Sequence, residues 1–384
     1  MSEYQYYEFL AIDRPLTEEE ISALRALSSR AHITPVSFTN HYEWGDFKGN
    51  PDKLMELFFD AHVYVANWRT AIFKVRVPIE AIPGNVVKEM AVPDFLDFKA
   101  TKTHWIITWS VNESENDDRF GMENGHGWMA RLAPVREEIL SGDMRSLYIG
   151  WLPAVTWEMI DDDEMEPLAM EGLGSLSAAQ KALAEFLEVD EDLLAGAGIG
   201  GPALHDESIS QKEMDAWVSG LPKDEVAALL NLLIAGKGHQ AERALKNRIV
   251  AYRRSLKAAK IDVPQRTVGE LRKRAEAAER IRHEQEKREQ EKREIKRRKE
   301  REAHLKNLAG DFPKMWKSVQ QYAERGTSLA YKDACRLLVD LAEAYSVHES
   351  RGIFDQELRR FMTAHLRRKA LIKRLVKAGI WNEK

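Results

Sequence analysis

The first part of the chain shows the apolar patterns of β-strands. Residues 4–12 are rich in aromatic and β-branched side chains, residues 71–77 alternate apolar and polar positions, and residues 103–111 are largely apolar. Residues 33–42 and 62–67 have the same character, with polar segments between them. The pattern predicts that these five segments form a sheet.

Helix signals lie between and after these strands. Thr17 followed by Glu18, Glu19 and Glu20 is a capping box, and Asn50-Pro51 opens a second helix. Residues 128–140 and 144–151 carry apolar side chains at helical spacing. This order predicts an α+β fold with an antiparallel or mixed sheet, for which a ferredoxin-like arrangement is one candidate.

An acidic run at residues 161–167 breaks the pattern and is expected to end the first domain as a solvated linker, with a cation site as the alternative. Residues 175–187, 190–195 and 210–256 have the apolar spacing of helices. A glycine cluster at 196–202 interrupts them. It lacks the preceding strand and the GK[ST] sequence of a phosphate-binding loop, so we expect a flexible connection there.

Residues 268–308 are dominated by Glu, Lys and Arg. Four Glu-first i,i+4 pairs support a helix that needs no core: Glu276–Arg280, Glu284–Arg288, Glu289–Arg293 and Glu294–Arg298. Only Ile281 and Ile295 offer an apolar seam, so a solvent-exposed single helix is favoured over a weak coiled coil. About 40 residues of helix would extend over about 60 Å, as a spacer or lever.

The last 76 residues are expected to contain a helical hairpin. Met315, Trp316, Val319 and Tyr322 share one helical face, and residues 331–345 form a second helix after Gly326. The predicted organisation therefore has four parts: an acidic, tryptophan-rich α/β domain (1–165), a helical domain with a glycine-rich break (166–265), the charged helix (266–308), and the hairpin with a basic amphipathic tail (309–384).

Charge is distributed unevenly along the 384 residues. The formal net charge is −5, but residues 1–210 hold 16 Lys and Arg against 37 Asp and Glu, a net −21, whereas residues 211–384 hold 41 against 25, a net +16. A basic half can bind nucleic acid or an acidic protein partner, and the two halves can also attract each other. The asymmetry leaves all three open.

Several classes of protein are not expected. No apolar stretch approaches the roughly 20 residues that span a bilayer, and the N-terminus lacks the pattern of a secretory signal, so a cytoplasmic protein without a membrane span is expected. The single cysteine, Cys335, excludes an intrachain disulfide and is expected to be an inert buried residue. With scattered histidines and no GxSxG sequence, no metal, cofactor or catalytic residue is predicted.

Two sets of residues are candidates for binding. The first would form an aromatic ligand pocket at strand ends and loops, although tryptophans in such a domain are usually core residues; it comprises Trp44, Asp46, Asn67, Trp68, Glu123, His126 and Trp128. The second is a basic amphipathic helix that could bind nucleic acid or an acidic partner, or simply be solvated; it comprises Arg359, Arg360, Arg367, Arg368, Lys369, Lys373, Arg374 and Lys377.

Six segments together resemble a family of uncharacterised bacterial proteins. They are residues 3–16, 44–49, 65–68, 180–187, 266–271 and 331–341. The resemblance extends over nearly the whole chain and implies a bacterial origin. The family has no established activity, so it assigns no catalytic residues.

Three functions fit these observations. The leading hypothesis is a non-enzymatic adaptor in which the α/β domain binds one protein partner and the basic helical end binds a second. The alternatives are a nucleic-acid-binding accessory protein and an enzyme of unknown reaction that uses the aromatic pocket.

Overall fold

The computed structural model describes residues 4–43, 45–68, 70–112, 125–168, 170, 172–199, 211–257 and 266–382. Contacts divide the chain into two compact units, Met1–Ile281 (unit 1) and Arg282–Lys384 (unit 2). We describe each unit by itself.

Unit 1 is built on a seven-stranded sheet in the order β2-β3-β1-β4-β5-β7-β6, and every neighbouring pair is antiparallel. The strands are β1 (Gln5–Leu10), β2 (His32–Thr34), β3 (Ser37–Tyr42), β4 (Ala61–Ala66), β5 (Thr70–Pro78), β6 (Leu96–Ala100) and β7 (His104–Val111). The α+β class is confirmed in its antiparallel form. The ferredoxin-like arrangement is also found: β1 to β4 follow the chain order strand-helix-strand-strand-helix-strand, and they lie in the antiparallel order β2-β3-β1-β4 of that fold. Strands β5, β7 and β6 extend the sheet beyond β4.

Two strands differ from the expected pattern. The segment 33–42 divides into β2 and β3, which pair as a hairpin through a turn at Pro35-Val36, because proline lacks the N–H that a continuous strand would use. Strand β6 had no clear signal, since only Leu96 of its five residues is buried. It lies at the edge of the sheet, where one exposed side of the backbone is tolerated.

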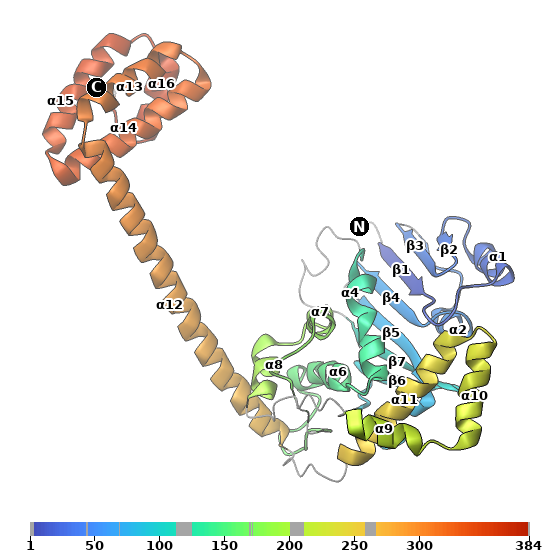
Figure 1. Cartoon of the computed structure of the whole chain (residues 1–384). Helices are drawn as coiled ribbons and strands as arrows, with labels where there is room; N and C mark the ends of the chain where they lie inside the picture. The colour runs from blue at the N-terminus through green and yellow to red at the C-terminus, as the bar shows by residue number, and fades with distance from the viewer. Residues whose placement is uncertain are drawn as a thin grey trace. The chain divides into compact units, whose positions relative to one another are not determined.

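Helices cover both faces of the sheet (Figure 1). Helices α1 (Glu18–Leu27) and α2 (Pro51–Leu57) cover a core that contains Phe9 and Phe38, which we call the small-face core. The opposite, large-face core receives the alternate residues of β5 and is covered by helices from the middle of the chain. These are α3 (Gly84–Met90), α4 (Trp128–Leu132), α5 (Pro134–Leu140), α6 (Arg145–Thr156), α7 (Ala178–Phe186) and α8 (Glu191–Gly198).

The local signals for α1 and α2 are realised as capping bonds. Thr17 and Glu20 form the reciprocal capping box, and Asn50 caps α2 with Pro51 in the first turn. The helix expected at 128–140 divides into α4 and α5 at Ala133-Pro134.

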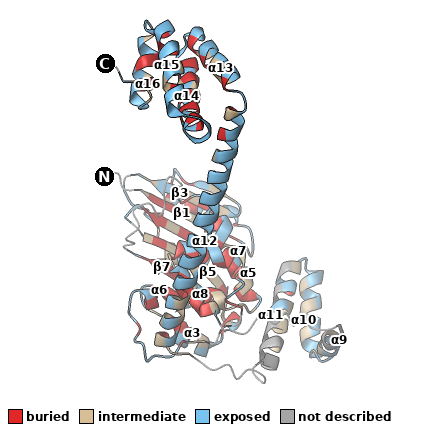
Figure 2. Ribbon diagram, turned by 90° about the vertical axis from the view of Figure 1, so that its left-hand side faces the viewer, coloured by how far each residue is buried: buried red, intermediate tan, exposed pale blue. Residues whose placement is uncertain are grey.

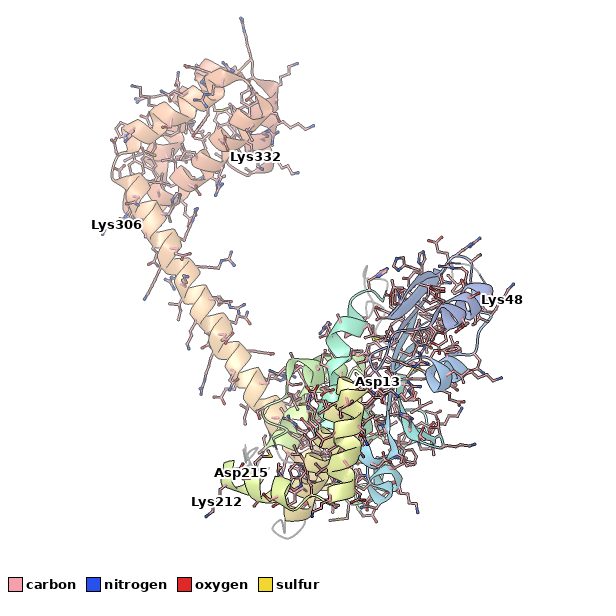
Figure 3. All side chains as sticks on the ribbon, turned by 45° about the vertical axis from the view of Figure 1, so that its right-hand side comes forward. Asp13, Lys48, Lys212, Asp215, Lys306 and Lys332 are labelled. Carbon is pink, nitrogen blue, oxygen red and sulfur yellow. The ribbon has the colours of Figure 1, made fainter. Side chains whose placement is uncertain are left out.

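A buried ion network anchors α5 to the sheet. Arg136 is 1% exposed; its guanidinium lies 2.9 Å from the carboxylate of Asp13 (labelled in Figure 3) and donates to the carbonyl oxygen of Arg76. Asp60 accepts from Arg76 at 2.8 Å. Burial raises the pKa of Asp60, but Arg136 and Arg76 outweigh burial and hold that pKa below its usual value. Each buried charge is thereby balanced.

Three further helices complete the described part of unit 1: α9 (Gln211–Ser219), α10 (Lys223–Ile234) and α11 (Gly238–Lys257). Helix α10 is largely apolar, yet none of its residues is buried. Leu230, Leu233 and Ile234 are 52%, 54% and 84% exposed.

The long charged helix is confirmed as α12 (Val268–Ala309), and the boundary between the units lies within it. Val268 and Leu271 join the large-face core, and Leu305 and Leu308 join the core of unit 2. Every residue from 283 to 300 is exposed, as the pale-blue middle of α12 shows (Figure 2). Ion pairs Glu284–Arg288 and Glu289–Arg293 form as expected, whereas Arg298 pairs with Glu302 and Arg280 donates to the carbonyl oxygen of Glu276.

Unit 2 is helical, with α13 (Phe312–Arg325), α14 (Ser328–His348), α15 (Arg351–His365) and α16 (Lys369–Lys377). The hairpin of α13 and α14 turns at Gly326, which has φ +68°, and Thr327 caps α14. Phe312 stacks on Tyr345 with ring centroids 3.8 Å apart. The basic tail, expected as one helix, is divided into α15 and α16 at residues 366–368.

Candidate interaction surfaces

The structure separates the members of the predicted aromatic pocket. Asp46 accepts a hydrogen bond from Gln5 Nε2 at 3.0 Å, on the face of β1 that carries Tyr7 and the small-face core. His126 contacts the ring of Tyr6, at 4.7 Å between centroids, on the face toward the large-face core. Because neighbouring residues of a strand point to opposite faces, the sheet lies between Asp46 and His126.

The remaining members occupy other places. Asn67 Oδ1 accepts from the backbone N–H of Tyr4 at 3.0 Å, and Trp68, 44% exposed, follows it in the β4–β5 turn. Trp128 is half-buried on Phe186, with ring centroids 5.0 Å apart. Trp44 and Glu123 lie outside the described residues. The described members therefore share one end of the sheet and do not line a single cavity.

The acidic run at 161–167 is more than the solvated linker that the sequence predicted, because it holds the start of α12. Asp162 forms an ion pair with Arg272, and its carbonyl oxygen accepts the N–H of Gly269 at 2.9 Å. The carbonyl oxygen of Glu164 accepts from Val268 N–H at 2.8 Å. The first turn of a helix has unpaired N–H groups and carries the positive end of the helix dipole. Acidic residues beside it are therefore stabilised.

Glu166 is the buried centre of this contact. It is 2% exposed, and its carboxylate lies 2.8 Å from Nε of Arg266 and accepts from Arg266 Nη2 at 2.9 Å. The hydroxyl of Tyr148 donates to the same carboxylate at 2.9 Å. Burial, followed by the charge of Glu166, raises the pKa of Tyr148 well above its usual value, so the hydroxyl remains a donor. No pattern in the sequence indicated that residues 148, 166 and 266 would contact one another.

Part of the glycine cluster also belongs to this contact. Gly196 and Gly198 lie in the last turn of α8, and a Cβ at Gly196 would come within 2.6 Å of the backbone nitrogen of Ala275. Arg274 donates to the carbonyl oxygen of Ile199 at 2.6 Å, beyond the end of α8. The expected flexible connection is therefore wrong for 196–199, where glycine lets α8 and α12 approach closely; residues 200–202 are outside the described residues.

A hollow of about 370 Å³ lies beside the acidic segment. Its lining combines apolar side chains with three carboxylates, and the residues are Glu89, Ala91, Val92, Trp151, Met159, Ile160, Glu164, Met165, Glu166 and Pro167. Trp151 and Ile160 are buried, whereas Met159 and Met165 are about half exposed. We call this hollow the acidic hollow. Trp157 comes two residues before the lining residue Met159, and its ring lies 6.2 Å from the ring of Phe95 between centroids.

The eight basic residues predicted to form a binding surface in the tail fall into two groups. Three have polar partners: Arg368 donates to Tyr331 Oη at 3.1 Å, Arg374 to Ser328 Oγ at 2.9 Å, and Arg360 pairs with Glu357 at 2.6 Å. The other five are exposed and form no ion pair with the described residues: Arg359, Arg367, Lys369, Lys373 and Lys377. The structure thus identifies which cations are available for binding.

Cys335 is half-buried, and its thiol donates to the carbonyl oxygen of Arg374 at 3.7 Å. Burial raises the pKa of that thiol, which disfavours the reactive thiolate. Within the described ranges, no group of three or more His, Cys, Asp or Glu side chains could hold a metal ion. No helix in the part of the chain that the structure describes is both long and apolar enough to cross a membrane.

No family model, curated protein or solved structure matches the chain.

Proposed function

We propose that the protein is a non-enzymatic adaptor, in which each unit contacts a different partner and α12 joins the two. The supporting observation is α12 itself. Its two ends belong to two different hydrophobic cores, while residues 283–300 are exposed on all sides. A helix with no apolar stripe is typical of a solvent-exposed connection between domains.

The charge of α12 supports the same role. Opposite charges four residues apart stabilise an isolated helix by about 0.2–0.5 kcal/mol per pair, which lets the middle remain helical without a core. Five i,i+4 ion pairs lie between residues 282 and 302. A protein that brings two partners together requires a connection of this kind between its binding domains.

Cleavage within α12 tests the adaptor. A protease recognition sequence is inserted between Gln290 and Glu291, partners are captured on the full chain through an N-terminal tag, and the bound complex is then cleaved. We expect at least one partner to elute with residues 291–384 and another to stay with residues 1–290. The uncut chain, which should retain both, is the control. If every partner stays with one fragment, the adaptor proposal fails.

Nucleic-acid binding is the second candidate, and the five exposed cations of α15, α16 and the turn between them favour it. Phosphate binding by such a set depends steeply on salt because it releases counterions. Changing Arg359, Arg367, Lys369, Lys373 and Lys377 together to Glu should abolish binding to mixed-sequence DNA and RNA. The control changes two basic residues of α12, Lys292 and Lys299, to Glu. Equal binding by wild type and the fivefold variant would contradict this function.

A further inference from the structure

Large apolar side chains are partly exposed in and beside the acidic hollow. Trp157, Met159 and Met165 are 50%, 55% and 48% exposed, and they lie within nine residues of one another. Exposed Met and Trp side chains gathered beside a concave surface are typical of protein–protein contacts, because Met adapts its shape and Trp buries a large area.

Acidic residues neighbour these apolar ones along the chain, and Glu89 and Glu164 line the hollow itself. Glu89, Glu158, Asp161 and Asp163 are exposed, and none of the four forms an ion pair within the described part of the chain. Asp162 and Glu166, in contrast, are already neutralised by Arg272 and Arg266. Of the three carboxylates that line the hollow, Glu166 is therefore balanced, whereas Glu89 and Glu164 form no ion pair with the described residues. The charge that remains available at the hollow is negative.

From these observations we infer that the acidic hollow binds a basic amphipathic segment of a protein partner, which presents large apolar side chains on one side and Lys or Arg on the other. The inference rests on the proposed adaptor and identifies the chemistry of the partner that unit 1 recognises. The apolar side chains of the segment would cover Trp157, Met159 and Met165. A Lys or Arg stem would enter the hollow along Trp151, with its charge near Glu89.

Other occupants match the surface less well. A purely apolar segment would remove the carboxylates of Glu89 and Glu164 from water without any compensating partner, which is costly. A phosphate or an acidic peptide would be repelled by the same carboxylates. A cationic segment without apolar residues would leave the methionines and Trp157 exposed, so it should bind more weakly.

Fluorescence anisotropy on the full chain tests the inference. The probe is a labelled 18-residue helix of Leu and Lys arranged with one apolar and one basic face. Its matched control peptide has the same number of Lys but Gln in place of every Leu. We expect the amphipathic peptide to bind at least tenfold more tightly than the control at 0.15 M salt, because general attraction to the acidic half of the chain affects both peptides equally.

Two pairs of substitutions locate the site. Each pair should lower the affinity for the amphipathic peptide at least tenfold. The first pair is Met159→Ser with Met165→Ser, and the second is Glu89→Lys with Asp163→Lys. Ile234→Ser, at an exposed apolar position of α10, and Glu291→Lys, at an exposed acidic position of α12, are the matched controls and should change its affinity less than twofold. Equal binding of both peptides, or equal binding by all variants, overturns the inference. If cleavage in α12 separates two partners while the peptide does not bind, the adaptor stands and only this inference fails.

Discussion

The contact at the start of α12 and the middle of the same helix are both dominated by opposite charges, but burial differs completely. At the start, Glu166 is 2% exposed and is held by Arg266 and Tyr148. In the middle, the side chains of Glu289 and Arg293 are 67% and 80% exposed. A buried charge is costly to leave unpaired, whereas an exposed pair is screened by water and salt. Similar residue types therefore fix tertiary structure in one place and maintain a solvated helix in the other.

Removing one buried partner should have the largest effect. In the Glu166→Gln variant, Arg266 loses its counter-charge in a site from which water is excluded, and we expect the free energy of unfolding of unit 1 to fall by about 3 kcal/mol. Urea unfolding of the full chain, followed by hydrogen exchange of peptides from α6 and the start of α12, measures it. The double change Glu166→Gln with Arg266→Met should recover part of the loss. A loss below about 1 kcal/mol would mean that the buried contact resembles the exposed pairs.

The difference between buried and exposed groups should also appear in the pH dependence of stability, for which a buried and an exposed histidine can be compared. Burial lowers the pKa of His62 to about 3, and its Nδ1 lies 3.0 Å from the carbonyl oxygen of Glu8. Between pH 6.5 and 3 the unfolded chain binds a proton at residue 62 that the folded chain does not, so stability is lost as pH falls through this range. From pH 8 to pH 5 this residue should cost about 2 kcal/mol.

Comparison of variants isolates this contribution. The free energy of unfolding of unit 1 should depend less on pH in His62→Gln than in wild type, by about 2 kcal/mol between pH 8 and 5. His283, exposed on α12, provides the matched control, and His283→Gln should keep the pH dependence of the wild type. The same dependence in all three proteins would show that His62 is protonated in the folded state.

Close packing of α8 against α12 should give a smaller effect. Because a Cβ at Gly196 would meet the backbone of Ala275 at 2.6 Å, Gly196→Ala should destabilise unit 1 by about 1–2 kcal/mol, despite the higher helix propensity of alanine. Gly84→Ala, with no atom within 4 Å of its Cβ, is the control and should be neutral or slightly stabilising. Equal stability of the two variants would indicate that the backbone of α12 can move away.

The exposed pairs should have the smallest effect. Glu284→Gln and Glu289→Gln each remove one i,i+4 partner, and each should change stability by less than about 0.5 kcal/mol, with no difference left in 1 M salt. Circular dichroism and urea unfolding at low and high salt measure this. A loss above 1 kcal/mol in either variant would show that the middle of α12 has contacts beyond its own turns.

Several elements follow from local sequence, and the structure contains them. The capping box at Thr17, the Asn50-Pro51 helix start and the charged run of α12 each depend on residues within a few positions of one another. Strand β6 and helix α3 had no such signal. The division of 33–42 into two strands could have been expected from Pro35, since proline disfavours the interior of a strand.

The candidate site was less predictable, because its members come from distant parts of the chain. The sequence indicated that Asp161–Glu166 is acidic and that Met159 and Met165 are apolar, but not that Glu164, Glu166 and the two methionines border one hollow with Glu89. For the basic tail the residue types were evident, whereas only the structure distinguishes Lys373, which is exposed, from Arg374, which is bonded to Ser328.

By itself the sequence determined the helix starts, the strand segments and the net charge of each half of the chain. It also determined the i,i+4 charge pairs that keep α12 helical without a core, since all of these depend on neighbours along the chain. Tertiary structure alone decided which charges are buried and which are free. Glu166 meets a hydrogen-bond donor 100 residues away, and Arg136 meets one acceptor 123 residues away. No local rule pairs such positions, because their proximity is set by how the sheet and helices pack around a shared core.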